Sequence, residues 1–523
     1  MVRYPEHVWH EADPSWPWPA DPALDDGVRD RPVLETLAAT VARHGSVVAL
    51  EDSEHRLTFD ALWHEIAVLV TQLAGSLGPV GILLPPGPAY SVALFACLAA
   101  NRPAILLDPA WPALRTSQIL DGAGVALLIL SPGAASIGNI QSVVVWPEPA
   151  SSRPGADLRL LRPLPVDAPA IILCTSGSTG RPKAIVHSQH TMMGKAWAQM
   201  NSCGVKAGAD LCLSLAPPAT LGGALAMLSC AVAGVGLRFL DLRRDGISGL
   251  IESLTQRPVT LLRAAPSALR LITALPDATR ILHGMRSVTL VSEPVLRGDI
   301  AVLRACIPPD AVIYTSYGST ESGSIAWYPS ATDTHDQFRA PAGRLTPGTA
   351  ALILDENGAP CAPDEPGELV LRSPYNALGE WHGGACRPGP FASDPTDPTR
   401  RIHHTGDIAR CTEDGVYIIL GRQDRMLKLN GQRIEPGEIE AALRACDGVA
   451  DAAVVSPNGR TLLAFVALHS GTTPDAVRAS LRTRLPASMI PSRIMPLDVL
   501  PQLPGGKVDL VRLTTLAKRG IAA

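Results

Sequence analysis

The chain has 523 residues, a formal net charge of −4, and 46% hydrophobic against 18% charged residues. This length exceeds one compact core, so several folded units are expected, and the composition excludes a disordered chain. The chain has no basic block, so its charge pattern gives no reason to expect nucleic acid or an anionic membrane as a partner. The ten cysteines lack metal-like spacing, which is typical of buried thiols in a reducing compartment and predicts a cytoplasmic protein.

The first part of the chain alternates apolar runs with helical periodicity, the pattern of an α/β fold. We predict strands in "VGILLPPG" (80–87), "PAILLDPAW" (103–111) and "VALLILS" (125–131), with a helix over 89–102. The uncharged segment from Leu211 to Leu237 is long enough to span a bilayer. Prolines and glycines interrupt it, so a buried helix between loops is the better interpretation, and we expect no membrane partner.

A second α/β set follows in 259–275, 287–292 and 311–318, and short strands from Thr346 onwards predict a small β subdomain. The C-terminal part predicts a compact α+β unit, with helices at "EPGEIEAALRAC" and "TTPDAVRASLRTRL". We therefore expect an α/β protein in two domains. Residues 1–423 would form a large N-terminal domain of two α/β subdomains plus a small β subdomain. Residues 424–523 would form a small, mobile α+β domain.

The stretch "TSGSTGRPK" follows the predicted strand "AIILC". A glycine-rich turn after a strand presents backbone N–H groups to an anion, so this stretch predicts a polyphosphate site. It is not a Walker loop, because Pro182 removes an N–H group and Ala184 cannot ligate magnesium. An ordinary Ser/Gly-rich surface turn is the alternative. The residues of the predicted site are Thr175, Ser176, Gly177, Ser178, Thr179, Gly180 and Lys183.

Four further strings follow in order: "YTSYGSTES", "HHTGDIAR", "GRQDRMLKLNGQRIEPGEIE" and "LPQLPGGKVDL". Together with the glycine-rich stretch, they resemble the superfamily of adenylate-forming enzymes. That group includes acyl-CoA synthetases, adenylation domains of non-ribosomal peptide synthetases, and luciferases. The resemblance runs from about Thr58 to Val511. "LAANRPAILLDPAWPALRTSQIL" and "LPASMIPS" are similar to the peptide-synthetase branch.

The resemblance implies a ligase that uses ATP and Mg²⁺ to convert a small carboxylic acid into an acyl-AMP, with release of pyrophosphate. Residues 175–180 and Lys183 would hold the β- and γ-phosphates. Glu321 would be the Mg²⁺ ligand, because a carboxylate suits this hard cation. Thr320 would bond the α-phosphate, and Tyr317, which precedes Gly318, would stack on adenine.

The ribose and the C-terminal domain complete the implied site. Asp407 can accept from two vicinal ribose hydroxyls, and Arg422 would contact the same sugar. Lys507, in "PGGK", resembles the adenylation lysine, which bridges the substrate carboxylate and the α-phosphate. Asp424, in "GRQD", matches the hinge about which the small domain would rotate between two half-reactions. Each residue has an ordinary alternative. Asp407 could be a turn residue, Arg422 a surface arginine, Lys507 a solvated charge, and Asp424 part of an ordinary interdomain linker. The histidines His187, His403 and His404 are expected to be structural or solvent-facing.

The acid pocket departs from the amino-acid-activating pattern. Those members anchor the substrate ammonium on an aspartate at the start of the helix in "APPATLGGALAML", where this chain has Leu221. Asp210 and Asp241 are too far along the chain. An unpaired ammonium in an apolar pocket is costly, so we expect a short-chain, branched or aryl acid without an α-amino group. The expected pocket residues are Thr220, Leu221, Gly222, Val291, Ser292, Ser322, Gly323 and Ile325. Ser292 stands where the family often has glycine.

No carrier-protein attachment serine is visible, so the thiol acceptor would be a separate acyl or peptidyl carrier protein, or coenzyme A. The flanking motifs favour a carrier protein. Two alternatives stay open: an amino-acid-adenylating enzyme with an unusual amine anchor, and a non-catalytic nucleotide-binding paralogue. The presence of Lys183, Glu321, Asp407, Arg422 and Lys507 argues against the paralogue. Nothing supports a luciferase-like oxidation.

Overall fold

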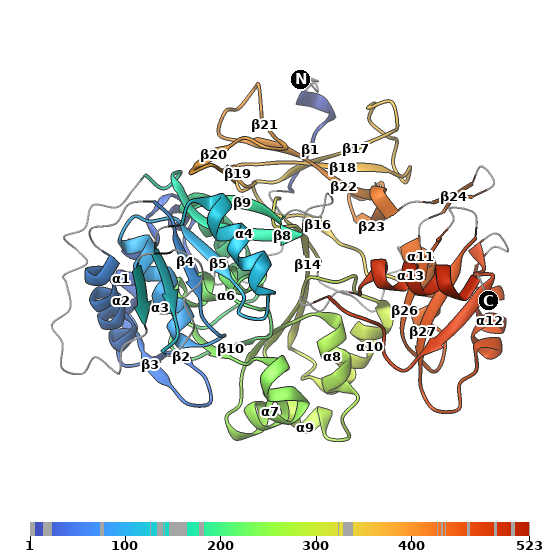
Figure 1. Cartoon of the computed structure of the whole chain (residues 1–523), viewed down its shortest axis with the longest axis horizontal. Helices are drawn as coiled ribbons and strands as arrows, with labels where there is room; N and C mark the ends of the chain where they lie inside the picture. The colour runs from blue at the N-terminus through green and yellow to red at the C-terminus, as the bar shows by residue number, and fades with distance from the viewer. Residues whose placement is uncertain are drawn as a thin grey trace.

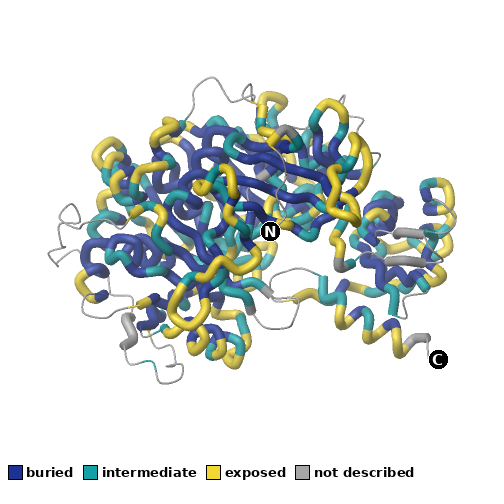
Figure 2. The backbone as a smooth tube through the Cα atoms, turned by 90° about the horizontal axis from the view of Figure 1, so that it is seen from above, coloured by how far each residue is buried: buried dark blue, intermediate teal, exposed yellow. Residues whose placement is uncertain are grey.

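The computed structural model describes residues 6–13, 23–73, 78–125, 127–132, 140, 142–145, 165–176, 182–322, 324–327, 338–425, 427–429, 432–434, 436–457, 461–485, 489–503 and 508–521. Two parts are distinct in Figure 1: a large N-terminal part, from blue to orange, and a smaller C-terminal unit in red. Buried backbone runs through the middle of both parts (Figure 2).

The first sheet has eight strands among the described residues. Its parallel strands β5, β4 and β6 are the apolar runs predicted from the sequence, and both faces of such a sheet are covered. The glycine-rich stretch starts in β8 and ends in β9, and these two strands pair antiparallel. In sheet order the strands are β20 (Ala385–Arg387), β19 (Gly379–His382), β9 (Pro182–Ser188), β8 (Pro169–Ser176), β5 (Ala104–Leu107), β4 (Val80–Leu83), β6 (Leu127–Leu130) and β7 (Ser142–Val145).

The second sheet has nine described strands, and six consecutive ones, from β14 to β2 in sheet order, are parallel. The carboxyl ends of parallel strands meet at one edge, which is where α/β sheets bind ligands. In sheet order the strands are β16 (Arg344–Leu345), β15 (Ser324–Trp327), β14 (Val312–Gly318), β13 (Ser287–Leu290), β12 (Leu261–Ala264), β10 (Leu211–Ser214), β11 (Gly236–Phe239), β2 (Val48–Glu51) and β3 (Arg56–Thr58).

Helices fill the space between the two sheets and cover their outer faces. One continuous core joins both sheets to α1 (Val33–His44), α2 (Phe59–Leu73), α3 (Pro88–Ala99), α5 (Gln189–Ser202) and α6 (Leu221–Val232). A second core packs α7 (Leu242–Gln256), α8 (Pro266–Thr273), α9 (Ala278–Leu282) and α10 (Arg297–Cys306) on the second sheet. Helix α4 (Ala113–Ala123) covers the first sheet.

The segment from Leu211 to Leu237 contains the expected buried helix, α6. Strands β10 and β11 flank it where loops were expected. Apolar residues dominate because the helix lies between two sheets, with side chains in the shared core. Within the described residues, no helix is both long and apolar enough to cross a membrane.

A six-stranded antiparallel sheet forms the β subdomain. Its edge strand β1 comes from the N-terminus and pairs with β17, and the guanidinium of Arg372 lies 4.6 Å from the ring centre of Trp9. The strands are β1 (His10–Glu11), β17 (Ala350–Leu354), β18 (Gly367–Ser373), β22 (Arg401–Cys411), β21 (Phe391–Ser393) and β23 (Tyr417–Arg422).

The C-terminal unit has its own cores around a three-stranded sheet. Its elements are the paired strands β24 (Leu427–Leu429) and β25 (Gln432–Ile434), strands β26 (Val449–Val455), β27 (Leu463–Leu468) and β28 (Arg493–Leu497), and helices α11 (Pro436–Arg444), α12 (Pro474–Arg482) and α13 (Leu510–Ile521).

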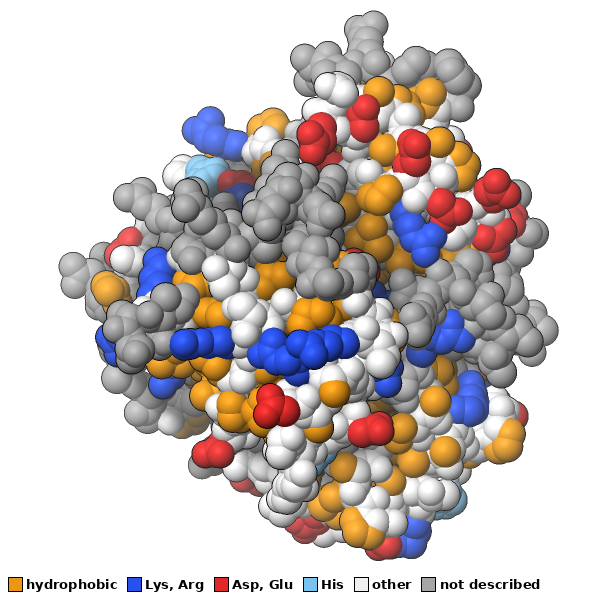
Figure 3. Space-filling model, turned by 90° about the vertical axis from the view of Figure 1, so that its right-hand side faces the viewer, with side chains coloured by type: hydrophobic (Ala, Val, Ile, Leu, Met, Phe, Trp, Pro, Cys, Tyr) orange, Lys and Arg blue, Asp and Glu red, His pale blue; other side chains and the backbone are white. Residues whose placement is uncertain are grey.

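Lys and Arg side chains form a row across the face seen in Figure 3. The expected α/β fold with a separate small domain is confirmed; the boundary at Asp424 and the mobility stay predictions.

Candidate active site

Most described candidate residues lie at the carboxyl edge of the second sheet. Thr220 and Leu221 come after β10, Val291 and Ser292 come directly after β13, and the segment 319–322 follows β14. The nucleotide and acid residues expected from separate motifs therefore share one sheet edge, the usual ligand site of parallel sheets.

Three residues expected to bind the nucleoside are joined by hydrogen bonds. Asp407 on β22 faces Arg422 on β23 as a register pair. The Tyr317 hydroxyl donates to Oδ2 of Asp407, while Nη1 of Arg422 lies 3.2 Å from Oδ1 and 2.7 Å from the carbonyl oxygen of Thr405. Burial, assisted by the charge of Asp407, raises the pKa of Tyr317 well above its ordinary value, so the hydroxyl stays a donor. The carboxylate is therefore held in one orientation.

A buried histidine holds the backbone of the segment after β14 by a hydrogen bond. Nε2 of His187 lies 2.8 Å from the carbonyl oxygen of Thr320, and its Nδ1 lies 3.2 Å from Oγ1 of Thr191. Burial lowers the pKa of His187 to about 3, because it disfavours the imidazolium. The neutral ring can donate from Nε2 and accept at Nδ1. His187 is thus structural, as expected, and it positions the backbone of Thr320.

Glu321 is held through its backbone. Its N–H lies 3.2 Å from Oγ of Ser319, and its carbonyl oxygen accepts from the N–H of Ala377 at 2.9 Å. The half-buried carboxylate makes no hydrogen bond with a described residue, so it fits a hard cation such as Mg²⁺. No group of three or more His, Cys, Asp or Glu side chains suited to a metal occurs in the described ranges. Mg²⁺ commonly takes one or two carboxylates plus substrate phosphates and water.

A buried lysine that the sequence motifs do not mark lies beside this segment. Lys195 of α5 is 7% exposed, and its ammonium donates to the carbonyl oxygen of Ser322. Burial lowers the pKa of Lys195 to about 7, and the negative charge of Glu321 acts in the opposite direction. Lys195 thus ties α5 to the segment that carries Thr320 and Glu321. A single lysine in an apolar helix gave no sequence signal for this role.

The phosphate stretch is described at its two ends. Thr175 and Lys183 are register partners in the β8–β9 pair. The Lys183 ammonium lies 3.8 Å from a carboxylate oxygen of Glu380 on β19. Gly177, Ser178, Thr179, Gly180, Gly323 and Lys507 lie outside the described residues, and Ser176 and Asp424 are described in backbone only.

The expected acid pocket begins at the N-terminus of α6. Thr220 caps this helix: its hydroxyl accepts from the N–H of Gly223 at 3.2 Å and donates to the carbonyl oxygen of Pro217 at 2.7 Å. Leu221 and Gly222 follow and are half-buried. Ser292 has φ +75°, a left-handed conformation that glycine adopts freely, which accounts for the glycine in the family pattern at this position. Ile325 is fully buried and is the register partner of Tyr317.

The two aspartates nearest the pocket in sequence have other partners. Asp210 pairs with Nη1 of Arg286 at 2.5 Å and accepts from Oγ1 of Thr260 at 2.8 Å. Asp241 caps α7 by accepting from the N–H of Arg243 at 3.1 Å. Neither carboxylate is therefore available as an amine anchor.

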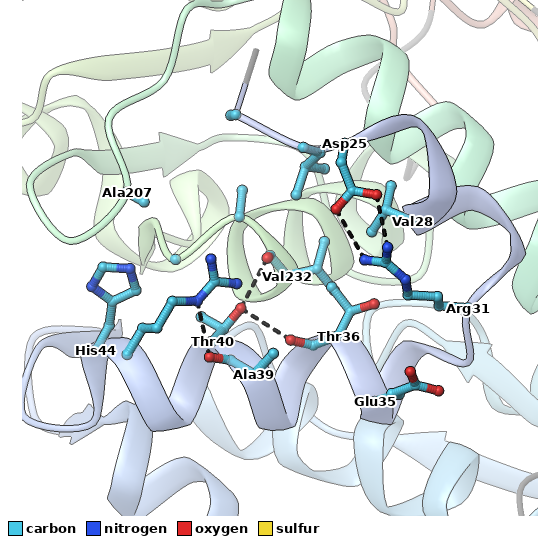
Figure 4. A pocket seen from close by; sticks show the side chains of 15 residues that line it. Asp25, Val28, Arg31, Glu35, Thr36, Ala39, Thr40, His44, Ala207 and Val232 are labelled. Carbon is cyan, nitrogen blue, oxygen red and sulfur yellow. Dashed lines mark hydrogen bonds and ion pairs between the residues drawn. The ribbon is translucent and has the colours of Figure 1, made fainter. Parts of the chain in front are cut away.

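A separate cavity of about 200 Å³ lies away from this edge, between α1, α6 and residues 23–31. Figure 4 shows its lining: Arg31 pairs with Asp25 at 2.9 Å, and Oγ1 of Thr40 lies 2.9 Å from the carbonyl oxygen of Val232. These groups satisfy one another, and no candidate residue of the sheet edge lies among them.

The candidate residues thus gather along one sheet edge, next to the hydrogen-bonded set Tyr317, Asp407 and Arg422. The AMP-binding enzyme model matches residues 37–381, and the AMP-binding enzyme C-terminal domain model matches residues 438–507. The chain therefore belongs to the AMP-binding enzyme family and is an enzyme of the adenylate-forming ligase superfamily.

The relatives of this chain include peptide synthetases. The chain is 32% identical to phosphinothricin tripeptide synthetase PhsC of Streptomyces viridochromogenes, over 93% of this chain and 45% of that protein. It is 30% identical to the isonitrile lipopeptide synthase of Streptomyces coeruleorubidus, over 95% of this chain and 34% of that protein. The chain thus spans less than half the length of these curated relatives.

Solved structures with this fold include smaller enzymes. Klebsiella oxytoca NpsA in complex with 3-hydroxyanthranilyl-AMSN matches with TM-score 0.76 at 21% identity, over 93% of this chain and 99% of that one. The anthranilate CoA ligase AuaEII in complex with anthranoyl-AMP matches with TM-score 0.78 at 19% identity, over 94% and 98%. The O-succinylbenzoate CoA synthetase of Bacillus subtilis with ATP and magnesium matches with TM-score 0.75 at 21% identity, over 90% and 98%.

Proposed function

We propose that this chain activates a carboxylic acid without an α-amino group, forming an acyl-AMP and pyrophosphate from ATP, and then transfers the acyl group to a thiol. The observation that carries the proposal is the hydrogen-bonded set Tyr317, Asp407 and Arg422 beside Thr320 and Glu321. It supplies an oriented carboxylate for ribose hydroxyls next to a carboxylate suited to Mg²⁺.

Each residue then has a defined task in the first half-reaction. Residues 175–180 and Lys183 bind the β- and γ-phosphates, and Thr320 donates to the α-phosphate. Mg²⁺ held by Glu321 would offset the phosphate charge. Lys507 bridges the acid carboxylate and the α-phosphate, where negative charge grows in the transition state. The protein's contribution is orientation and electrostatic stabilisation.

The absence of an amine anchor among the described pocket residues supports the choice of acid. Leu221 stands at the start of α6, Thr220 uses its hydroxyl as the helix cap, and Asp210 and Asp241 have other partners. A substrate ammonium placed here would lose its water without gaining a carboxylate. The same reasoning disfavours the amino-acid-adenylating alternative.

In the second half-reaction, the acyl group passes to a thiol that the described residues do not supply. The likeness to peptide synthetases favours the phosphopantetheine of a carrier protein over coenzyme A. Rotation of the C-terminal domain about Asp424 would withdraw Lys507 and admit the thiol.

The test is ATP–pyrophosphate exchange with fatty, aryl, hydroxy and amino acids. Lys507→Ala is compared with Lys518→Ala, a change at an exposed lysine of the same unit. We expect exchange with an amine-free acid, a loss of about a hundredfold or more in Lys507→Ala, and little change in Lys518→Ala. Exchange with amino acids alone would favour the alternative ligase. Nucleotide binding without exchange would favour the non-catalytic paralogue.

A further inference from the structure

One buried arginine has no partner of its own within the described part of the chain. Arg263 on β12 is 4% exposed, and its Nε and Nη1 make no hydrogen bond to any described residue. The other buried arginines have partners: Arg238 pairs with Glu51, and Arg372 pairs with Asp394 and two glutamates. Arg102 and Arg339 donate to backbone carbonyl oxygens. A guanidinium always carries its charge, so burying one without an anion is unfavourable unless something else supplies the anion.

The surroundings of Arg263 are polar and incompletely bonded. Its register partners are Ser214 on β10 and Thr289 on β13, which share its face of the sheet. The hydroxyl of Ser214 and both amide atoms of Gln199 on α5 also have no hydrogen-bond partner among the described residues. Ser214 and Gln199 are themselves 7% and 6% exposed. Native interiors pair such groups, so several unpaired ones together indicate a missing polar ligand.

The position of the Arg263 guanidinium follows from its effect on the nearby thiol of Cys203. Burial raises the pKa of the Cys203 thiol at the end of α5, and the charge of Arg263 acts in the opposite direction. Sγ of Cys203 lies 3.4 Å from Oγ1 of Thr289. Gln199 is one helical turn before Cys203, so α5 directs both residues toward the same strands. Arg263 therefore lies between α5 and the sheet.

This cluster adjoins the expected acid pocket. Thr289 and Val291 are two residues apart and so point to the same face, and the N–H of Val291 bonds the carbonyl oxygen of Ala264, the residue after Arg263. An acid that presents one carboxylate at the sheet edge, beside Thr320, would extend its other end toward Arg263.

We propose that the acid activated by this enzyme carries a second carboxylate, which Arg263 binds. The inference rests on the proposed function and narrows it to dicarboxylic acids. Arg263 is a specificity-determining residue, because the carboxylate that it binds takes no part in the chemistry. Its planar guanidinium can hold a carboxylate by two parallel hydrogen bonds, and Gln199 and Ser214 supply further donors.

The experiment compares acids matched in length, such as succinic with butyric acid and glutaric with valeric acid, by ATP–pyrophosphate exchange. We expect the wild type to prefer the diacid in kcat/KM. Arg263→Met should lower kcat/KM for the diacid by about thirtyfold or more, the cost of unpairing a buried carboxylate, and leave the monoacid unchanged or better. Arg263→Lys should retain part of the preference. Arg238→Met, at a buried arginine on strand β11 of the same sheet, is the matched control for misfolding.

Diacid binding can also be measured without catalysis, by the shift in melting temperature. This separates a loss of binding from a loss of activity. The diacid alone should raise the melting temperature of the wild type and not that of Arg263→Met, and the ligand-free variant should melt no lower than the wild type. Exchange with diacids that is indifferent to Arg263→Met, together with a lower melting temperature of this ligand-free variant, would overturn the inference and leave the adenylation proposal intact. Failure of exchange with every acid would instead count against adenylation, and the diacid melting shift would then decide the role of Arg263.

Discussion

At the residue scale, the cluster proposed to bind the nucleoside depends on one carboxylate. Asp407 accepts from Tyr317 and from Arg422. Asp407→Asn removes the charge that both donors favour, and should weaken ATP binding by about 10- to 100-fold. Calorimetric titration with ATP tests this. Asp414→Asn, in the turn between the same strands, should leave ATP affinity unchanged; equal affinity in both variants would remove Asp407 from the site.

His187 gives the stability of the protein a defined pH dependence. The unfolded chain protonates this ring below about pH 6.5, but the folded protein only near a pKa of about 3. Its effect is absent above pH 6.5, and as the pH falls toward 3 the ring removes up to about 1.4 kcal/mol of unfolding free energy per pH unit. His187→Gln should reduce this slope in urea unfolding between about pH 6 and 4.

The pKa of His404 is shifted in the opposite direction to that of His187. Its hydrogen bond with Glu368 raises the pKa of His404, so this pair stabilises the fold at low pH and loses that effect as the pH rises through the raised pKa. His404→Gln should therefore remove a gain of stability that the wild type shows as the pH falls through the raised pKa of His404 toward 6.5, whereas His187→Gln acts below pH 6.5. An unchanged slope in His187→Gln would mean that the ring has the same pKa in the folded and unfolded protein.

Sequence motifs identified the catalytic candidates but neither buried cation. The stretch 259–275 is predicted as part of the second α/β set, yet its pattern does not say that Arg263 faces inward without a carboxylate. Lys195 is equally unmarked within α5. Burial and pairing depend on which strands and helices become neighbours, and that information comes only with the tertiary structure.

At the element scale, α5 is the support of the site. Ser188 and Thr191 form its capping box, with hydrogen bonds of 3.1 and 3.0 Å. On its other side, Gly194 packs against the ring of Tyr375 so closely that an added Cβ would lie 2.1 Å from ring atoms. The glycine thus lets α5 approach the β subdomain while Lys195 reaches the opposite segment.

Gly194→Ala should destabilise the protein by about 1–3 kcal/mol, because the ring and the helix must separate. Unfolding in urea measures the change. Gly122→Ala is the matched control: Gly122 also lies inside a helix, α4, but an added Cβ would meet nothing within 4 Å. The control should be neutral or stabilising by up to about 1 kcal/mol. Equal effects in both variants would show that α5 and the subdomain are not tightly packed.

Element prediction succeeded where apolar periodicity was strong. Strands β4, β5, β6 and β13 and helix α6 follow from their runs because each lies in a core. The long-range pairings did not follow: β1 joins β17 and β19 joins β9 across large separations in sequence. Such pairings are set by tertiary packing, and no local pattern encodes them.

At the scale of the whole molecule, the C-terminal unit has cores of its own. Among the described residues, those cores begin at Ile439, apart from Phe338, which packs against one of them. A protein of residues 1–423 should therefore fold and bind ATP, but lack pyrophosphate exchange because it lacks Lys507. Calorimetry and exchange beside full-length Lys507→Ala test this. Exchange by residues 1–423 would remove Lys507 from the reaction.

The order in which the chain contributes strands to the two sheets also affects how the protein folds during translation. The second sheet takes in β2 from the start of the chain, and the first sheet is completed by β19 and β20, up to Arg387. Neither layer can close while the ribosome is still making the middle of the chain, because each needs strands that lie far apart in sequence. The edge of β9 stays open until β19 emerges, and open strand edges recruit other chains. The nascent enzyme should thus depend on chaperones through most of its translation.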